Sequence, residues 1–280
     1  MLEIYIPLIL GFILGLKKIF TKEDAKTLIN FVIYLSLPAL SFKTSSTIPI
    51  NTQNIKIAIC AYLTISLCVL TSYLVAKSMR LEKSDEKSFI VVSSFGNTAF
   101  LGFPLTISLL GESYLPYAVI YDGLGSFLAI STLGIMVLSG KPDLKTPLLF
   151  PPFIGFLLGI FLRPLGLYPV LSHLVEFLIS PLMPVVLFAL GLGLRFEPAN
   201  LKLLAMALGI KILISPLFAF LIATALGLPA TALKVCVLES SMPTMLTASA
   251  LILKFGHNYQ LAITSSTIGI TLWLFILLII

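Results

Sequence analysis

Long apolar runs, separated by short polar or charged segments, dominate the chain. A helix needs about 20 apolar residues to cross about 30 Å of hydrocarbon. Dividing the runs at charged residues and at Pro and Gly clusters yields ten windows of roughly this kind. The pattern predicts an all-α integral membrane protein whose ten spans cover residues 2–19, 25–45, 55–79, 88–110, 115–139, 148–162, 169–194, 201–226, 231–253 and 258–280.

The composition agrees with a lipid environment. The 280 residues are 58% hydrophobic and 11% charged, whereas soluble domains carry about 25% charged residues. The net charge of +6 is spread between apolar runs rather than gathered on one tail, so it does not indicate nucleic acid. The first run, 2–16, has no basic leader and no small-residue cleavage site, so we expect it to be a retained span.

The three cysteines, Cys60, Cys68 and Cys236, fall inside apolar runs. Their odd number and the lack of metal-ligand spacing predict buried thiols rather than a disulfide or a metal site. No cofactor is expected. The sequence also has no Walker A pattern and no Rossmann glycine fingerprint, which argues against direct ATP drive.

Lys and Arg distribute unequally between the two predicted sides of the membrane. Lys43, Lys56, Arg163 and Lys234 fall on one side and Lys211 lies within a span. By the positive-inside rule the side richer in Lys and Arg is cytoplasmic, which places both termini on the outer side of the cell membrane. The richer side holds Lys17, Lys18, Lys22, Lys26, Lys77, Arg80, Lys83, Lys87, Lys141, Lys145, Arg195, Lys202 and Lys254.

The two halves of the chain, 1–140 and 141–280, repeat one another. Residues 6–15 and 151–159 share an apolar pattern punctuated by Pro and Gly, and Pro38 and Pro184 occupy corresponding spans. Spans four and nine each end in a glycine, Gly111 and Gly256. Because five spans is an odd number, the second copy would be inverted in the membrane, as in many secondary transporters. Apolar Gly- and Leu-rich helices also resemble each other by composition alone, which is the alternative explanation.

Spans four and nine contain polar interruptions, at 93–104 and 239–247. Pro, Gly and Asn in these stretches favour unwound backbone, which is tolerated at membrane depth only against protein or a water-filled cavity. Both interruptions fall about 14 to 18 Å deep at 1.5 Å per residue. Paired broken helices at the midplane indicate a transporter binding site, and their N-termini favour anions. A kink satisfied by nearby Ser and Thr side chains is the other explanation.

Ionisable residues within spans are costly and are therefore functional candidates. Asp122 and Glu239 are candidates to hold a proton or a cation. Lys211 is a candidate to balance either acid, to attract an anion, or to extend toward the cytoplasm. Glu176 comes early in its span, so we expect it at the interface.

The sequence resembles the auxin efflux carrier family, the PIN-like transporters and their prokaryotic relatives. The resemblance covers nearly the whole chain and rests on four stretches. They are Gly96-Asn97-Thr98 through Gly102-Phe103-Pro104-Leu105, Ser241-Met242-Pro243, Leu190-Gly191-Leu192, and Leu37-Pro38-Ala39-Leu40-Ser41-Phe42.

The resemblance implies ten helices with an outside N-terminus, a scaffold of spans 1, 2, 6 and 7, and a mobile unit of spans 3–5 and 8–10 that moves like an elevator. It also implies a homodimer through the scaffold. By this resemblance the substrate carboxylate would contact Asn97, Ser41 and Asp122. The full set of substrate-binding candidates is Asn97, Ser41, Gly96, Thr98, Pro104, Ser241, Pro243 and Thr244.

The leading hypothesis is a secondary carrier of a small organic anion, such as a carboxylate or an indole acid, in a lipid bilayer. A sodium- or proton-coupled carrier of the bile-acid or exchanger type and a membrane sensor that moves nothing remain alternatives. An intramembrane enzyme is not expected, because the sequence has no nucleophile–base pair and no His-Glu-x-x-His motif. The short 140–147 segment makes regulation through a long cytoplasmic loop unexpected.

Overall fold

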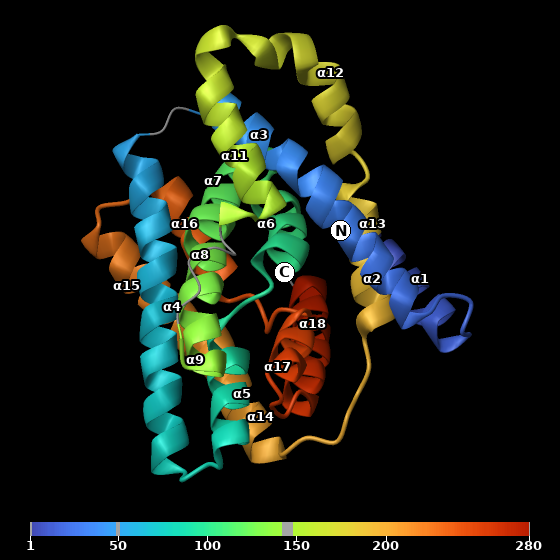
Figure 1. The fold of residues 1–280 in the computed structure, drawn as a ribbon, viewed down its shortest axis with the longest axis vertical. Helices are drawn as coiled ribbons and strands as arrows, with labels where there is room; N and C mark the ends of the chain where they lie inside the picture. The colour runs from blue at the N-terminus through green and yellow to red at the C-terminus, as the bar shows by residue number, and fades with distance from the viewer. Residues whose placement is uncertain (1, 49–50, 142–147, 280) are drawn as a thin grey trace. The chain divides into compact units, whose positions relative to one another are not determined.

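The computed structural model describes residues 2–48, 51–141 and 148–279, and all regular elements within these ranges are helices (Figure 1). Lys145 and most of the 140–147 segment lie outside these ranges. Within these ranges, six helices are long and apolar enough to cross a membrane, and three shorter ones are also apolar. The six are Glu23–Thr47, Thr52–Ser78, Glu112–Ser139, Leu167–Gly193, Leu201–Ala225 and Gln260–Ile279; the shorter three are Leu2–Leu16, Thr98–Leu110 and Pro151–Leu165.

The structure therefore confirms an all-α membrane protein with several spans, whereas the count of ten and the inverted repeat stay predictions. The predicted spans one, four and six fall on the shorter helices. Predicted span nine is interrupted, so neither of its halves reaches the length of a complete crossing.

The chain divides into two compact units, Met1–Thr52 with Lys145–Gly193, and Gln53–Leu144 with Leu194–Ile280. The assignment of the first as scaffold and the second as mobile unit stays a prediction. The first unit contains α1 (Leu2–Leu16), α2 (Lys22–Phe31), α3 (Leu37–Thr47), α11 (Pro151–Leu162), α12 (Leu167–Ile179) and α13 (Leu182–Gly193).

Glycines permit close helix packing in the first unit. A Cβ atom on Gly11 of α1 would overlap the carbonyl oxygen of Phe188 in α13, and one on Gly191 of α13 would overlap the carbonyl oxygen of Leu8. Such small residues let helix backbones approach one another in lipid, where no hydrophobic force drives helices together. The Lys43 ammonium and the Glu176 carboxylate of the same unit are 2.5 Å apart and both partly exposed.

The second unit holds the remaining helices. They are α4 (Thr52–Ser78), α5 (Lys83–Ser94), α6 (Phe103–Leu110), α7 (Leu115–Ile120), α8 (Phe127–Ala129), α9 (Ile135–Ser139), α14 (Leu201–Gly209), α15 (Ser215–Ala225), α16 (Ala230–Ser240), α17 (Ala248–Lys254) and α18 (Gln260–Ile279), with π-helical turns at Thr98–Gly102, Tyr121–Ser126, Ile130–Gly134 and Ile210–Ile214.

Helix α4 shows how lipid acts as solvent for this unit. Its hydroxyl-bearing Thr64 and Ser72 are fully buried, whereas a row of large apolar residues is exposed. This reverses the polarity of a water-soluble helix, so the helix is built for lipid on the outside and for polar packing within. The exposed row consists of Ile55, Ile59, Leu63, Leu67, Leu70 and Leu74.

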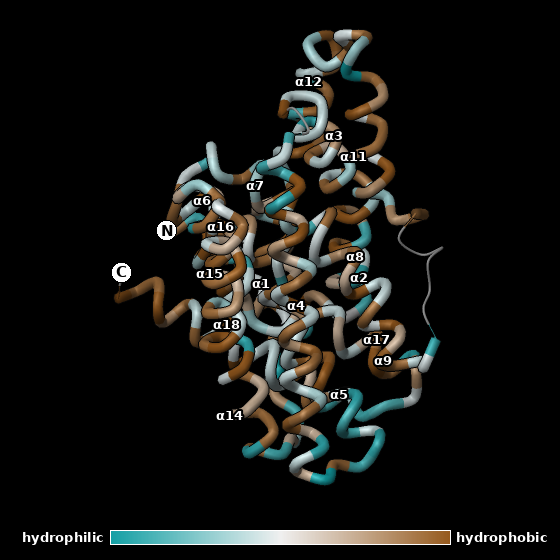
Figure 2. The backbone as a smooth tube through the Cα atoms, turned by 90° about the vertical axis from the view of Figure 1, so that its left-hand side faces the viewer, coloured by the Kyte–Doolittle hydropathy of each residue, from teal (hydrophilic) through white to brown (hydrophobic). Residues whose placement is uncertain are grey.

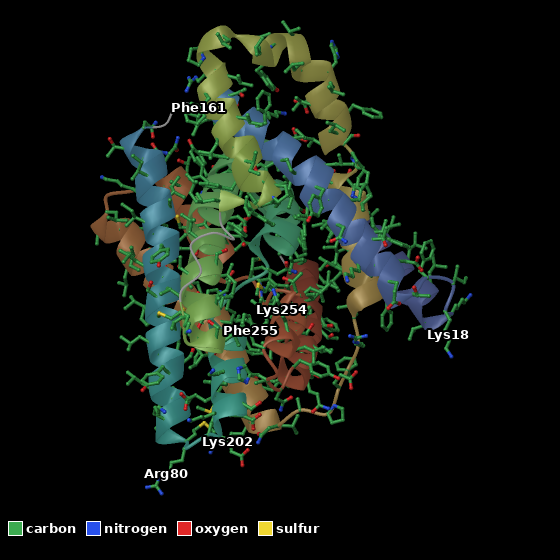
Figure 3. The ribbon with its side chains drawn as sticks, viewed as in Figure 1. Lys18, Arg80, Phe161, Lys202, Lys254 and Phe255 are labelled. Atoms are coloured by element: carbon green, nitrogen blue, oxygen red, sulfur yellow. The ribbon has the colours of Figure 1, made fainter. Side chains whose placement is uncertain are left out.

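One strongly hydrophilic stretch lies at the end of the second unit where α5 begins. Figure 2 shows hydrophobic (brown) colouring prominent along most helices and a hydrophilic (teal) stretch around the start of α5. Figure 3 places Arg80 and Lys202 at the same end of the second unit. These two residues belong to the set predicted to be cytoplasmic.

Both interrupted spans finish at glycines, as the sequence indicated. Gly111 follows α6 with φ of 107°, and Gly256 follows α17 with φ of 74°. Backbone with positive φ is accessible to glycine without the penalty that a Cβ atom imposes. These two positions therefore set the ends of the second half of each interrupted span.

Candidate functional site

The backbones of the two interruptions bind each other. The amide of Asn97 donates to the carbonyl oxygen of Pro243 at 2.8 Å, and the amide of Met245 donates to the carbonyl oxygen of Phe95 at 3.1 Å. Backbone groups that the two breaks leave without helical partners therefore form hydrogen bonds with one another inside the second unit, as buried polar groups must. We call this contact the crossing.

The backbone and the side chain of Thr244 both contribute to the crossing. Gly96 and Thr244 form an isolated antiparallel bridge. The Thr244 hydroxyl donates to the carbonyl oxygen of Val92 at 2.8 Å and lies 2.9 Å from the hydroxyl of Ser265 in α18. Thr244 is fully buried, so these hydrogen bonds tie three segments together without competition from water.

The Asn97 side chain is the open end of the crossing. It is 3% exposed, and among the described residues its Nδ2 atom has no hydrogen-bond partner. Asn97 also precedes the helical segment Thr98–Leu110, whose first amides carry the positive end of the helix dipole. A buried amide donor at this place suits an acceptor such as a carboxylate oxygen.

Lys211 lies against the crossing. Its Nζ atom donates to the carbonyl oxygen of Ser240 at 2.9 Å and lies 3.5 Å from the hydroxyl of Ser215. A Cβ atom on Gly96 would be 3.0 Å from this Nζ atom. The two ion pairs found within the described ranges do not include Lys211. Lys211 therefore forms no direct ion pair with Asp122 or Glu239 within these ranges, and its role in balancing the charge of either acid stays a prediction.

Asp122 accepts a hydrogen bond from the Thr98 hydroxyl. Thr98 begins the helix that follows the crossing, and Asp122 lies in the π-turn after α7, so this bond joins two elements. The structure thus brings two predicted site residues into contact and gives Asp122 a neutral partner.

Glu239 is completely buried and is the next-to-last residue of α16. Its Oε1 atom accepts a hydrogen bond from the Thr106 hydroxyl at 2.9 Å. Its Oε2 atom has no partner within the part of the chain that the structure describes. The carboxylate fills the space beside Gly102, where a Cβ atom would overlap it. The Glu239 carboxylate, which lies beside Gly102, therefore links the two interrupted spans through its hydrogen bond with Thr106.

The other predicted residues are less closely joined to this group. Ser241 is buried, and its carbonyl oxygen accepts a hydrogen bond from Trp273 at 3.1 Å. Pro104 is buried in the first turn of α6. Ser41 belongs to the first compact unit, where it is buried in α3, and its part in the site stays a prediction.

Sequence reasoning missed four residues that hold this site together. Each is a polar side chain inside an otherwise apolar span, which was the available signal. The three Ser and Thr residues of this set were not singled out, because Ser and Thr in membrane helices commonly form hydrogen bonds with their own backbone. They are Thr106, Ser215, Ser265 and Trp273.

Comparison with known proteins identifies the family. The model of the family described as Membrane transport protein matches residues 1–147 and 135–280, which together cover the chain. The chain belongs to this family. It is a multi-pass membrane transporter rather than an enzyme, and the resemblance to the auxin efflux carriers is confirmed.

Two archaeal relatives are similar over most of their length. An uncharacterized transporter of Methanothermobacter thermautotrophicus is 29% identical over 260 residues, covering 89% of this chain and 86% of the relative. An uncharacterized transporter of Methanocaldococcus jannaschii is 30% identical over 309 residues, covering 99% of this chain and 97% of the relative.

Proposed function

We propose that this transporter carries a small organic anion, a carboxylate or an indole acid, whose carboxylate binds at the crossing. The observation that carries the proposal is the buried Asn97 Nδ2 donor, which lacks a partner among the described residues. A buried donor left without an acceptor costs about 1 to 3 kcal/mol. A substrate carboxylate would supply the acceptor and recover that cost.

Two positive features beside the crossing support binding of an anion. The Lys211 ammonium lies close to Gly96, the residue before Asn97. The N-terminus of the Thr98–Leu110 helix adds the positive end of a dipole. Asp122 is a nearby acid whose charge would disfavour an anion. It accepts its hydrogen bond from the Thr98 hydroxyl, so it leaves the Asn97 donor free.

For the movement, we propose alternating access of the elevator type in a ten-span protein with both termini outside. The division into two compact units supports this proposal, because an elevator needs one part that moves and one that stays. The second unit contains the crossing and would carry the substrate. The first unit would act as the scaffold, through which two copies of the chain would form a homodimer.

The test is uptake of labelled carboxylates by purified protein in liposomes, with and without proton and sodium gradients. Wild type should show saturable uptake, and Asn97→Ala should lose it by about tenfold or more, since a hydrogen bond to a charged group contributes about 1.5 to 3 kcal/mol. Asn258→Ala is the matched control, because Asn258 is exposed in a loop. Binding without uptake under any gradient would contradict transport and indicate a sensor.

Asp122→Asn in the same liposomes tests coupling. The amide keeps the size of the side chain and an oxygen that accepts the Thr98 hydroxyl bond, but it cannot hold an exchangeable proton. We expect uptake to persist and its dependence on a proton gradient, if wild type shows one, to disappear. A gradient dependence equal to that of wild type would remove Asp122 from coupling.

A further inference from the structure

The C-terminal end of α16 holds a fully enclosed ammonium. Lys211 is 2% exposed, and its Nζ atom donates to the carbonyl oxygen of Ser240, the last residue of α16, at 2.9 Å. The Ser215 hydroxyl donates to the same carbonyl oxygen at 2.8 Å and lies 3.5 Å from Nζ. One carbonyl and one hydroxyl oxygen thus face a single positive charge.

A third oxygen lies nearby. The position that a Cβ atom on Gly96 would take is 2.9 Å from Lys211 Cε, 3.0 Å from Lys211 Nζ and 3.0 Å from the carbonyl oxygen of Met242. The ammonium therefore lies beside the unwound backbone of both interrupted spans. A side chain at position 96 would contact both the ammonium and this backbone, so glycine leaves room for the Lys211 side chain.

The oxygens around Lys211 are of the kind that bind a monovalent metal cation. The carbonyl groups at the end of a helix lack intrahelical donors and carry the negative end of the dipole. In secondary transporters, half-helix C-termini and unwound backbone carbonyls coordinate sodium ions. Here a side chain of the protein itself supplies the positive charge at such a place.

No carboxylate within the described ranges forms a direct ion pair with this lysine. Both ion pairs found in the described ranges involve other residues. Glu239, the residue before Ser240, directs its Oε1 atom to Thr106 instead. An ammonium buried without a direct ion pair is costly, and for that reason an ionisable residue inside a membrane span is a functional candidate.

We propose that the Lys211 ammonium occupies the place of a coupled monovalent cation, so that the carrier needs no sodium ion and becomes sodium-responsive only when this side chain is removed. The inference rests on the proposed function for its transport readout, but its binding readout does not require transport.

The binding test is thermal unfolding of the detergent-purified protein in sodium chloride or in N-methyl-D-glucamine chloride at equal ionic strength. The melting temperature of wild type should be the same in both salts. Lys211→Ala vacates the space, so its melting temperature should rise with sodium concentration and saturate. Lys211→Met is the matched control, because it removes the charge but keeps the space filled, and it should not respond.

The transport test uses the liposomes described above. Wild-type uptake should not change when sodium replaces N-methyl-D-glucamine. Lys211→Ala should lose uptake about tenfold or more without sodium, since a charged hydrogen bond of ordinary strength shifts an equilibrium by about that factor, and sodium should restore part of it. Lys211→Met should stay inactive in both salts.

Sodium-specific stabilisation of wild type overturns the proposal, and this comparison needs no variant to fold. A folded Lys211→Ala that is indifferent to sodium also overturns it, as does a sodium response of Lys211→Met equal to that of Lys211→Ala. If wild type takes up no carboxylate at all, the proposed function fails, and the melting temperatures still decide the role of Lys211.

Discussion

Gly102→Ala tests whether Glu239 is held as the structure shows. A methyl group on Gly102 would overlap all three carboxylate atoms of Glu239, so the carboxylate would have to move. Its hydrogen bond with Thr106 is 2.9 Å long and would not survive a displacement of that size. The substitution therefore adds one methyl group and removes one buried hydrogen bond.

The cost has two parts. Inserting a methyl group into a packed interior costs about 1 to 3 kcal/mol, and losing a buried hydrogen bond to a carboxyl group costs about 1 to 3 kcal/mol. Alanine recovers about 0.5 to 1 kcal/mol of backbone entropy relative to glycine. We expect a net destabilisation of about 3 kcal/mol, which corresponds to roughly 6 to 12 °C in melting temperature for a protein of this size.

The assay is thermal unfolding in detergent with Gly209→Ala as the matched control. Gly209 is helical and belongs to the same unit, and a Cβ atom there meets nothing within 4 Å. In a Glu239→Ala background, Gly102→Ala should cost far less, because the clash is gone. Equal melting temperatures for Gly102→Ala and Gly209→Ala, or an undiminished cost in the Glu239→Ala background, would refute the reasoning.

Three further substitutions are read by the same unfolding assay. Thr244→Val removes two buried hydrogen bonds between segments and should lower the free energy of unfolding by about 1 to 2 kcal/mol. The control Thr271→Val, whose hydroxyl donates to Thr267 of the same helix, should change little. Equal effects would contradict a role of Thr244 in the crossing. Gly191→Ala should cost about 1 to 3 kcal/mol by pushing α13 away from α1, whereas a Cβ atom on Gly15 makes only ordinary contact; tolerance of Gly191→Ala would refute the close approach. Glu176→Gln should cost less than about 1 kcal/mol because its ion pair is partly exposed, and a larger loss would mean that the pair is shielded from solvent.

Much of the architecture could be predicted from the order of apolar and polar residues. Lipid requires each span to satisfy its own backbone, so length and hydropathy alone reveal helices. Proline and glycine restrict or release specific dihedral angles, so a break within 93–104, a break within 239–247 and the helix ends at Gly111 and Gly256 were visible without coordinates. The breaks are shorter than predicted, because 98–104 and 239–240 are helical. The buried thiols Cys60, Cys68 and Cys236 were also predicted correctly.

The partners of the buried polar groups were not predictable in this way. Asp122 and Glu239 bind hydroxyl groups that lie 24 and 133 residues away in the sequence, and Lys211 binds a helix-end carbonyl rather than either acid. Spacing within one helix says which residues share a face, but the rotation and depth of separate helices decide which faces meet. The sequence by itself determined the helices and their breaks, because these depend on neighbouring residues. Only the tertiary structure decided which polar atoms pair at the crossing and which, like the Asn97 amide, stay open among the described residues, because that choice depends on distances between segments far apart in the chain.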